Sequence, residues 1–137
     1  MSADLRSAAE RVARQAYAPH SGFHVGAALR SARGQIYLGC NVENAAYPVS
    51  SCAERGAISA AVAAEGKDFK LHAIAVVALN AQGDSLPVTP CGACRQILVE
   101  FGADAEAGFS APDGHWQTVR VGDLLPFRFI LPDIGSR

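Results

Sequence analysis

The chain has 137 residues, half of them hydrophobic, and a formal net charge of −1 at pH 7. These values fit one domain, residues 1–137, that encloses its own apolar core. No run of Lys or Arg offers the basic surface that nucleic acids or anionic membranes require, and every long apolar stretch is interrupted by charges, so we expect a small, roughly neutral partner, with no nucleic acid and no membrane involved.

The first element predicted is an amphipathic helix over residues 3–17, which Pro19 terminates. Its apolar side chains recur at helical spacing: Leu5, Ala8, Ala9, Val12 and Ala16. Charges run throughout Met1–Arg14, which is not typical of a secretory signal peptide. We therefore expect a cytoplasmic protein whose four cysteines serve metal binding and not disulfide formation.

A hairpin is predicted next. Val25–Leu29 and Ile36–Cys40 are apolar runs on either side of a turn around Gly34. The loop Tyr17–Phe23, which contains proline and glycine, leads into the first strand, and the polar segment Asn41–Ser51 follows the second. This segment has a high density of hydrogen-bonding groups for a loop that precedes a helix.

Helices and strands alternate through the rest of the chain. The alanine-rich run from Cys52 to Ala64 predicts a helix capped by a serine, Ser50 or Ser51, and the run from Pro90 to Phe101 predicts another, capped by Thr89. The strands predicted here are Ala73–Leu79, buried on both faces, and the pair Ala107–Ser110 and Trp116–Val121 around an Asp113-Gly114 turn. Right-handed β-α-β units would place both helix starts over one edge of an α/β sheet.

Residues able to perform chemistry gather at these two helix starts. Cys52 and Glu54 belong to the first, and Cys91 and Cys94 to the second. Three thiolates can hold a zinc ion with its fourth position left for water, and a carboxylate that is not a ligand can move the protons of that water. The positive ends of the helix dipoles favour the thiolates.

Two other interpretations of the cysteines stay open at this point. The Cys91-Gly-Ala-Cys94 segment alone also fits a thioredoxin-like redox motif, which would need neither Cys52 nor Glu54. A non-catalytic zinc module would recruit Cys40 as a fourth ligand and close the site. The combination of Cys-x-Glu with Pro-Cys-x-x-Cys favours the hydrolytic site, because it is the pattern of zinc nucleobase deaminases with Cys in place of the first His.

Several ordered motifs between Tyr17 and Phe129 resemble those of the cytidine deaminases, the small zinc enzymes of nucleoside salvage. They are Tyr17-Ala-Pro-x-Ser, Phe23-x-Val-Gly-Ala-Ala, Gly39-Cys-Asn-Val-Glu-Asn-Ala, Cys52-Ala-Glu-Arg, Pro90-Cys-Gly-Ala-Cys-Arg-Gln and Leu124-Leu-Pro-x-x-Phe. The resemblance implies a three-layer α/β fold with a mixed sheet of about five strands flanked by helices. It also implies a Zn²⁺ cofactor, hydrolytic deamination of cytidine and deoxycytidine with release of ammonia, and a homotetramer with shared active sites. A related deaminase of another aminopyrimidine nucleoside, such as a nucleoside antibiotic, is the alternative.

The resemblance further implies roles for individual residues. Cys52, Cys91 and Cys94 would bind zinc, and Glu54 would be the proton shuttle. A larger set would contact the substrate: Phe23, Asn41, Glu43, Ala45, Tyr47, Ala53 and Phe129. Of these, Ala45, Tyr47 and Phe129 would reach into a neighbouring subunit's site. Apart from the resemblance, three thiolates make zinc electron-rich, so we expect Arg55, immediately after Glu54, to donate hydrogen bonds to the sulfurs and withdraw charge, and Pro90 to support the ligands without binding the ion.

Overall fold

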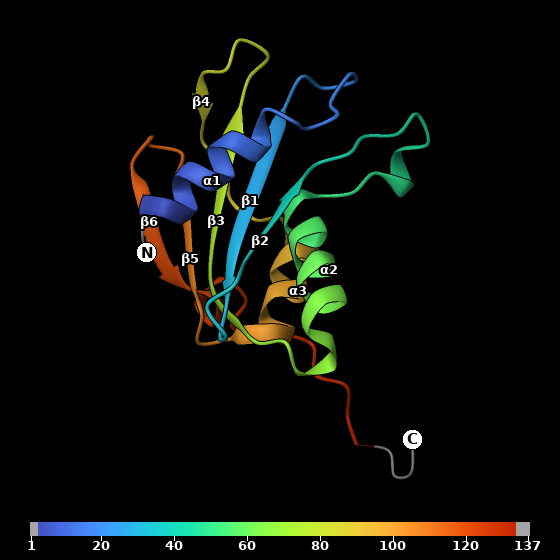
Figure 1. Ribbon diagram of the computed structural model, residues 1–137, viewed down its shortest axis with the longest axis vertical. Helices are drawn as coiled ribbons and strands as arrows, with labels where there is room; N and C mark the ends of the chain where they lie inside the picture. Colours follow the sequence, from blue (N-terminus) through green and yellow to red (C-terminus); the bar gives the residue numbers. More distant parts are fainter. Residues whose placement is uncertain (1–2, 134–137) are drawn as a thin grey trace.

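A computed structural model describes residues 3–133, which form a six-stranded sheet with helices on both faces (Figure 1). The elements in chain order, with η denoting a 3₁₀ helix, are α1 (Ala3–Ala13), β1 (His24–Ser31), β2 (Ile36–Cys40), η1 (Tyr47–Val49), α2 (Ala53–Glu65), η2 (Gly66–Asp68), β3 (Leu71–Leu79), β4 (Ser85–Leu86), α3 (Gly92–Gly102), β5 (Glu106–Ser110), β6 (Trp116–Arg120) and η3 (Val121–Leu124). Within the described range, no helix combines the length and apolarity that crossing a membrane demands.

The sheet is mixed, as expected, and its strands follow the order β2-β1-β3-β5-β6, with the short β4 paired to β3. The β1–β2 hairpin is antiparallel and turns at Gly34, whose φ of +87° lies in the left-handed region that favours glycine. β3 and β5 are parallel, with Ile74 opposite Ala107, and α3 connects them. This β-α-β unit is the part of the topology that alternating strands and helices predict.

The helices lie in two layers, one on each side of the sheet (Figure 1). Leu5 and Ala9 of α1 pack on one face against buried side chains of β1 and β3. Ala57 of α2 and Leu98 of α3 pack on the other face, in the larger apolar cluster. Because β3 has helices on both sides, nearly all of its residues are buried, which explains its unbroken apolar sequence.

The first helix is shorter than its periodicity predicts, because it ends at Ala13 and not at residue 17. Tyr17 pairs instead with the segment that follows β2. Its N–H donates to the Asn41 carbonyl at 3.1 Å, and its own carbonyl accepts from the Glu43 N–H at 2.8 Å. Helical backbone at Tyr17 would lose both bonds, so tertiary pairing overrides the local helical pattern.

The starts of α2 and α3 also differ from the prediction, since no serine or threonine side chain caps them. Cys52 and Cys91 are themselves the N-cap residues, both with extended backbone (φ −77°, ψ 155° and φ −67°, ψ 168°). The predicted caps, Ser50 or Ser51 and Thr89, are therefore wrong. Each cysteine lies at the very end of its helix, where the positive end of the helix dipole is strongest.

Gly39 of β2 lets the first turns of α2 pack directly on the sheet. A Cβ at this position would lie 2.3 Å from the Ala53 carbonyl oxygen and 2.4 Å from the Ala57 nitrogen. Both are backbone atoms of α2, so a side chain on Gly39 can be accommodated only if the helix start moves. The helix start carries Cys52 and Glu54.

We predict that Gly39→Ala lowers the free energy of unfolding by roughly 1–3 kcal/mol, the usual cost of overpacking a core contact. Gly56→Ala is the matched control, because Gly56 faces Gly39 across the same contact but its added Cβ would lie an ordinary 3.5 Å from the Gly39 Cα. The control should gain up to about 1 kcal/mol from higher helix propensity. Urea denaturation of the two variants measures both values, and equal stabilities would contradict this packing account.

Candidate active site

Three cysteines from the two helix starts meet in space. Cys52 is the N-cap of α2, Cys91 is the N-cap of α3, and Cys94 lies in the first turn of α3. Their Sγ atoms all lie within 4.8 Å of one another. Within residues 3–133 this is the one group of three or more Cys, His, Asp or Glu side chains whose ligand atoms converge so closely.

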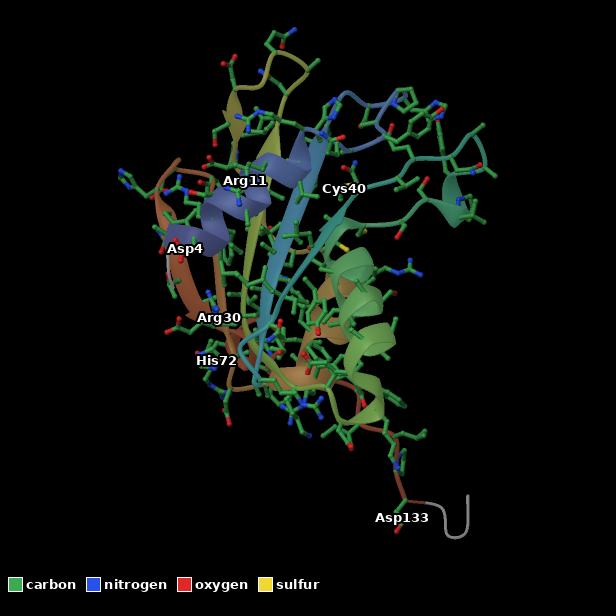
Figure 2. The ribbon with its side chains drawn as sticks, viewed as in Figure 1. Asp4, Arg11, Arg30, Cys40, His72 and Asp133 are labelled. Carbon is green, nitrogen blue, oxygen red and sulfur yellow. The ribbon has the colours of Figure 1, made fainter. Side chains whose placement is uncertain are left out.

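The geometry of this cluster fits a tetrahedral zinc ion. Zn–S bonds of about 2.3 Å place the sulfurs of such a site roughly 3.8 Å apart, within the spread of the cluster. Cys40 does not belong to the group, so the described residues do not form a closed four-cysteine site. Cys40 lies where β2 ends, and His72, on β3, lies at the opposite end of the sheet (Figure 2). Three cysteine ligands would leave a fourth coordination position of such an ion open.

The thiols of Cys52 and Cys94 interact strongly. The Cys52 sulfur accepts a hydrogen bond from the Cys94 thiol, which is the main reason that the pKa of Cys52 falls from 9.0 to about 6. The positive charge of Arg55 contributes to the same shift. The shared hydrogen bond, together with burial, raises the pKa of Cys94, which keeps its proton as the donor of the pair. The lowered pKa of Cys52 favours the thiolate, which is the form of cysteine that binds a metal cation.

Glu54 is a buried carboxyl group beside the cysteines. It lies in the first turn of α2 and is only 4% exposed. Burial raises the pKa of Glu54, and the negative charge of Cys52 adds to the effect. A carboxyl group that retains its proton at higher pH than usual is suited to general acid and base catalysis near neutrality.

A cavity of about 260 Å³ gives access to these groups. Its wall contains all three cysteines and Glu54, together with four residues that the resemblance assigns to substrate binding: Phe23, Asn41, Glu43 and Ala53. Ser50, Ser51, Val88 and Thr89, which the sequence analysis did not place in the site, also line it. The cavity is thus a mixed apolar and polar recess with a candidate metal centre and a buried carboxyl group in its wall.

Two polar residues of the cavity wall hold the loop before β1. The Asn41 side-chain amide donates to the Phe23 carbonyl and accepts from the Val25 N–H, both at 2.8 Å. The Glu43 carboxylate accepts hydrogen bonds from the His20 N–H, the Ser21 N–H and the Ser21 hydroxyl. The Ser21 hydroxyl is the main cause of the lowered pKa of Glu43.

The remaining predicted site residues lie outside this cavity or behind it. Tyr47 is 71% exposed and stands edge-on to the ring of His20, with ring centroids 5.9 Å apart. Phe129 is 65% exposed and lies in the C-terminal segment, and Ala45 is an exposed loop residue. One chain therefore does not bring Ala45, Tyr47 and Phe129 to its own cavity wall. Arg55, which follows Glu54 in sequence, is exposed, and Pro90, which precedes Cys91, is fully buried.

Sequence reasoning overlooked Arg95, which follows the last cysteine. Its Nε–H donates to the Pro90 carbonyl at 2.8 Å, and its Nη1 donates to the Leu124 carbonyl at 3.0 Å. The sequence contains a signal for this role: Arg95 is a cation near the start of a helix, where the helix dipole disfavours positive charge, so a different interaction must retain it.

Comparisons with known proteins agree with this site. Residues 2–107 match the family described as "Cytidine and deoxycytidylate deaminase zinc-binding region". A cytidine deaminase from Sporosarcina psychrophila is 42% identical over 132 residues, which cover 96% of this chain and 93% of that protein. The crystal structure of the Burkholderia pseudomallei cytidine deaminase is similar at a TM-score of 0.82, with 42% identity and coverage of 94% and 100% of the two chains. The crystal structure of the Mycobacterium tuberculosis cytidine deaminase is similar at a TM-score of 0.78, with 39% identity and coverage of 93% of this chain and 96% of that chain.

Glu43 should make stability depend on pH. Its folded-state pKa lies below the ordinary value of 4.5, so its contribution is complete above that value and is lost as the pH falls through the lower folded-state pKa. We predict that wild type is more stable than Glu43→Gln by a constant margin above about pH 5.5 and that this margin shrinks toward pH 3. Unfolding curves across this range test it, with Glu100→Gln on α3 as the control. A margin unchanged at pH 3 would contradict the role of Glu43.

Proposed function

The chain belongs to the cytidine and deoxycytidylate deaminase family, and on this basis we propose that it is a zinc-dependent hydrolase that converts cytidine and deoxycytidine to uridine and deoxyuridine and releases ammonia. One observation carries the proposal: three convergent cysteine sulfurs share a cavity wall with a buried carboxyl group. A thioredoxin-like reductase has no use for Cys52 or Glu54 in this arrangement.

The chain supplies the ligands and the proton carrier of the reaction. Cys52, Cys91 and Cys94 would hold Zn²⁺, which lowers the pKa of water from 15.7 to about 7 in favourable sites and so supplies a nucleophile at neutral pH. Glu54 takes a proton from the attacking water and delivers it to ring nitrogen N3 as the new oxygen bond forms at C4. It then carries the proton of the new C4 hydroxyl to the amino group, the C4–N bond breaks as the C4 carbonyl forms, and ammonia leaves.

Phe23, Asn41 and Glu43 would form the nucleoside end of the site. Phe23 is 36% exposed at the cavity, so its ring can pack against a pyrimidine. Asn41 and Glu43 fix the loop that carries Phe23, and their oxygen atoms can also accept from ribose hydroxyls. Ala53 lines the wall between Cys52 and Glu54. A free nucleoside as substrate places the enzyme in pyrimidine salvage, which we propose occurs in the cytoplasm.

We further propose a homotetramer in which neighbouring chains complete each site. The support lies in Ala45, Tyr47 and Phe129, which are absent from their own chain's cavity wall. The C-terminal segment that carries Phe129 also exposes Phe127 at 99% and Ile130 at 66%. Clustered exposed apolar side chains of this kind mark surfaces that contact other proteins. Covering a neighbour's cavity would bury them and exclude water from the reaction.

Glu54→Gln tests the proposed chemistry. We predict that this variant retains zinc and its fold but loses at least about 10²-fold in the rate of ammonia release from cytidine, the lower end of a general acid-base contribution. Glu65→Gln makes the same chemical change at the other end of α2, where Glu65 accepts from the Tyr37 hydroxyl at 2.8 Å, and should stay active. A wild type that releases no ammonia from cytidine or deoxycytidine would refute the function, whereas a fully active Glu54→Gln would refute only the proton carrier.

Shared sites can be tested by mixing two defective chains. A Glu54→Gln chain lacks the proton carrier, and a Tyr47→Ala, Phe129→Ala chain lacks the covering residues. Each should be nearly inactive alone. After joint unfolding and reassembly, some sites would combine a sound Glu54 with sound covering residues from a neighbour. Ammonia release should then exceed the sum of the two parents.

A size tag on one chain confirms that mixed assemblies form, and each variant refolded with itself is the control. Activity that stays at the sum of the parents, in assemblies shown to be mixed, would mean that every chain builds its own site.

A further inference from the structure

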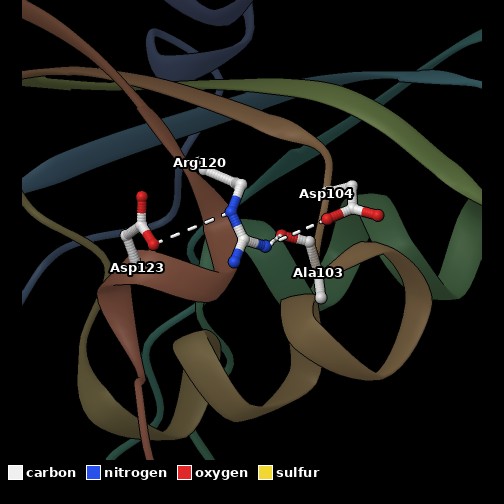
Figure 3. Close-up of polar contacts among 4 residues, drawn as sticks. All are labelled: Ala103, Asp104, Arg120 and Asp123. Atoms are coloured by element: carbon white, nitrogen blue, oxygen red, sulfur yellow. Dashed lines mark hydrogen bonds and ion pairs between the residues drawn. The ribbon is translucent and has the colours of Figure 1, made fainter.

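Two arginines connect α3 with η3, one at each end of the contact. Arg95, in α3, donates to the carbonyl of Leu124, the last residue of η3, at 3.0 Å. Arg120, just before η3, donates to the carbonyl of Ala103, the residue after α3, at 2.9 Å, and pairs with Asp104 and Asp123 (Figure 3). The two arginines thus make similar connections at opposite ends of α3.

Arg95 differs from Arg120 in its second acceptor. Its Nε–H donates to the Pro90 carbonyl at 2.8 Å. That carbonyl and the Cys91 nitrogen belong to the same planar peptide unit, so fixing the carbonyl also fixes the direction in which Cys91 leaves the plane. Pro90 is fully buried, and its ring restricts its own φ torsion, which lies on the N-terminal side of this peptide unit. Arg95 therefore orients the backbone of Cys91.

Cys91 is the cysteine whose position depends most on this turn. Cys94 lies within α3 and is 0% exposed, so helix geometry and packing fix it. Cys91 lies before the helix, is exposed, and makes no side-chain capping hydrogen bond. The Cys91 carbonyl accepts from the Arg95 N–H at 2.9 Å, and on the other side of its Cα the orientation of the residue depends on the Pro90–Cys91 peptide.

Helix stability does not explain an arginine at this position. A cation in the first turns of a helix is disfavoured by the helix dipole. Arg95 is also half-buried, so part of its hydration is lost. Its two hydrogen bonds to backbone carbonyls offset these costs. The bond to Pro90 holds the turn that precedes Cys91, and the bond to Leu124 holds the start of the C-terminal segment.

We propose that Arg95 is a positioning residue for the metal site, which presents the Cys91 thiolate to the ion by fixing the Pro90–Cys91 peptide. The inference rests on the proposed function, because it takes zinc to be the ion. Arg95 touches neither the ion nor the substrate and acts through the main chain. Mutation of outer partners that orient metal ligands in this way typically costs about 10–100-fold in metal affinity or activity.

The first test compares Arg95→Met with Arg120→Met, each of which removes an arginine bond to a backbone carbonyl at one end of α3, although only Arg95 also holds the Pro90 carbonyl. Methionine retains an apolar stem but has no donor. Zinc-loaded proteins are mixed with a chromophoric chelator, and the rate of zinc release is followed by absorbance. We expect release from Arg95→Met to be about 10–100-fold faster than from wild type. Arg120→Met should release zinc at the wild-type rate, and equal rates for the two variants would overturn the proposal.

The second test needs no metal. Hydrogen exchange of the zinc-free proteins reports the order of the turn through the amides of residues 91–94, and these should exchange faster in Arg95→Met than in Arg120→Met. If Arg95→Met does not fold, Arg95→Lys replaces it, because a lysine keeps the charge but cannot span two carbonyls with a planar fork. Unchanged exchange overturns the positioning role. A wild type that binds no zinc refutes the proposed function, while the exchange result still decides whether Arg95 holds the turn.

Discussion

The site depends on the convergence of two helix starts over one edge of the sheet. Three sulfurs within 4.8 Å of one another are stable as thiolates only when positive charge offsets their mutual repulsion. The dipoles of α2 and α3 provide part of that charge, and Arg55 adds to it at Cys52. A cation would provide the rest. The close packing of α2 against Gly39 and the β3-α3-β5 crossover hold the two helix starts in place.

The start of α2 gives Cys52 and Glu54 different environments, and these shift their pKa values in opposite directions. Cys52 is partly exposed at its helix end and has a pKa lowered to about 6, while Glu54, two residues later, is buried and has a raised pKa. One helical turn thus presents the proposed metal ligand and the proposed proton carrier to the same cavity. The environment of each group, and not its residue type alone, determines which of the two tasks it can perform.

Much of the fold could be predicted from the sequence. The hairpin, the buried strand β3 and the two helices that carry the cysteines follow from periodicity and turn residues, and the topology then brings the cysteines together. The helix caps could not be predicted this way, because Ser51 and Thr89 have the right chemistry but α2 begins at Ala53 and α3 at Gly92, so that Cys52 and Cys91 occupy the N-cap positions. The end of α1 depends on pairing between Tyr17 and the segment after β2, and Arg95 acts on carbonyls 5 and 29 residues away, which local patterns do not reveal.

Stoichiometric reconstitution tests most directly whether the three-cysteine cluster is the zinc centre of a cytidine deaminase. Zinc-free protein is titrated with Zn²⁺ while ammonia release from cytidine is measured at each addition. We predict no activity without the metal, a linear rise on addition, and saturation at one zinc ion per chain, as a single three-cysteine cluster requires. Full activity in the zinc-free protein, or zinc uptake to this stoichiometry without any ammonia release, would contradict the account.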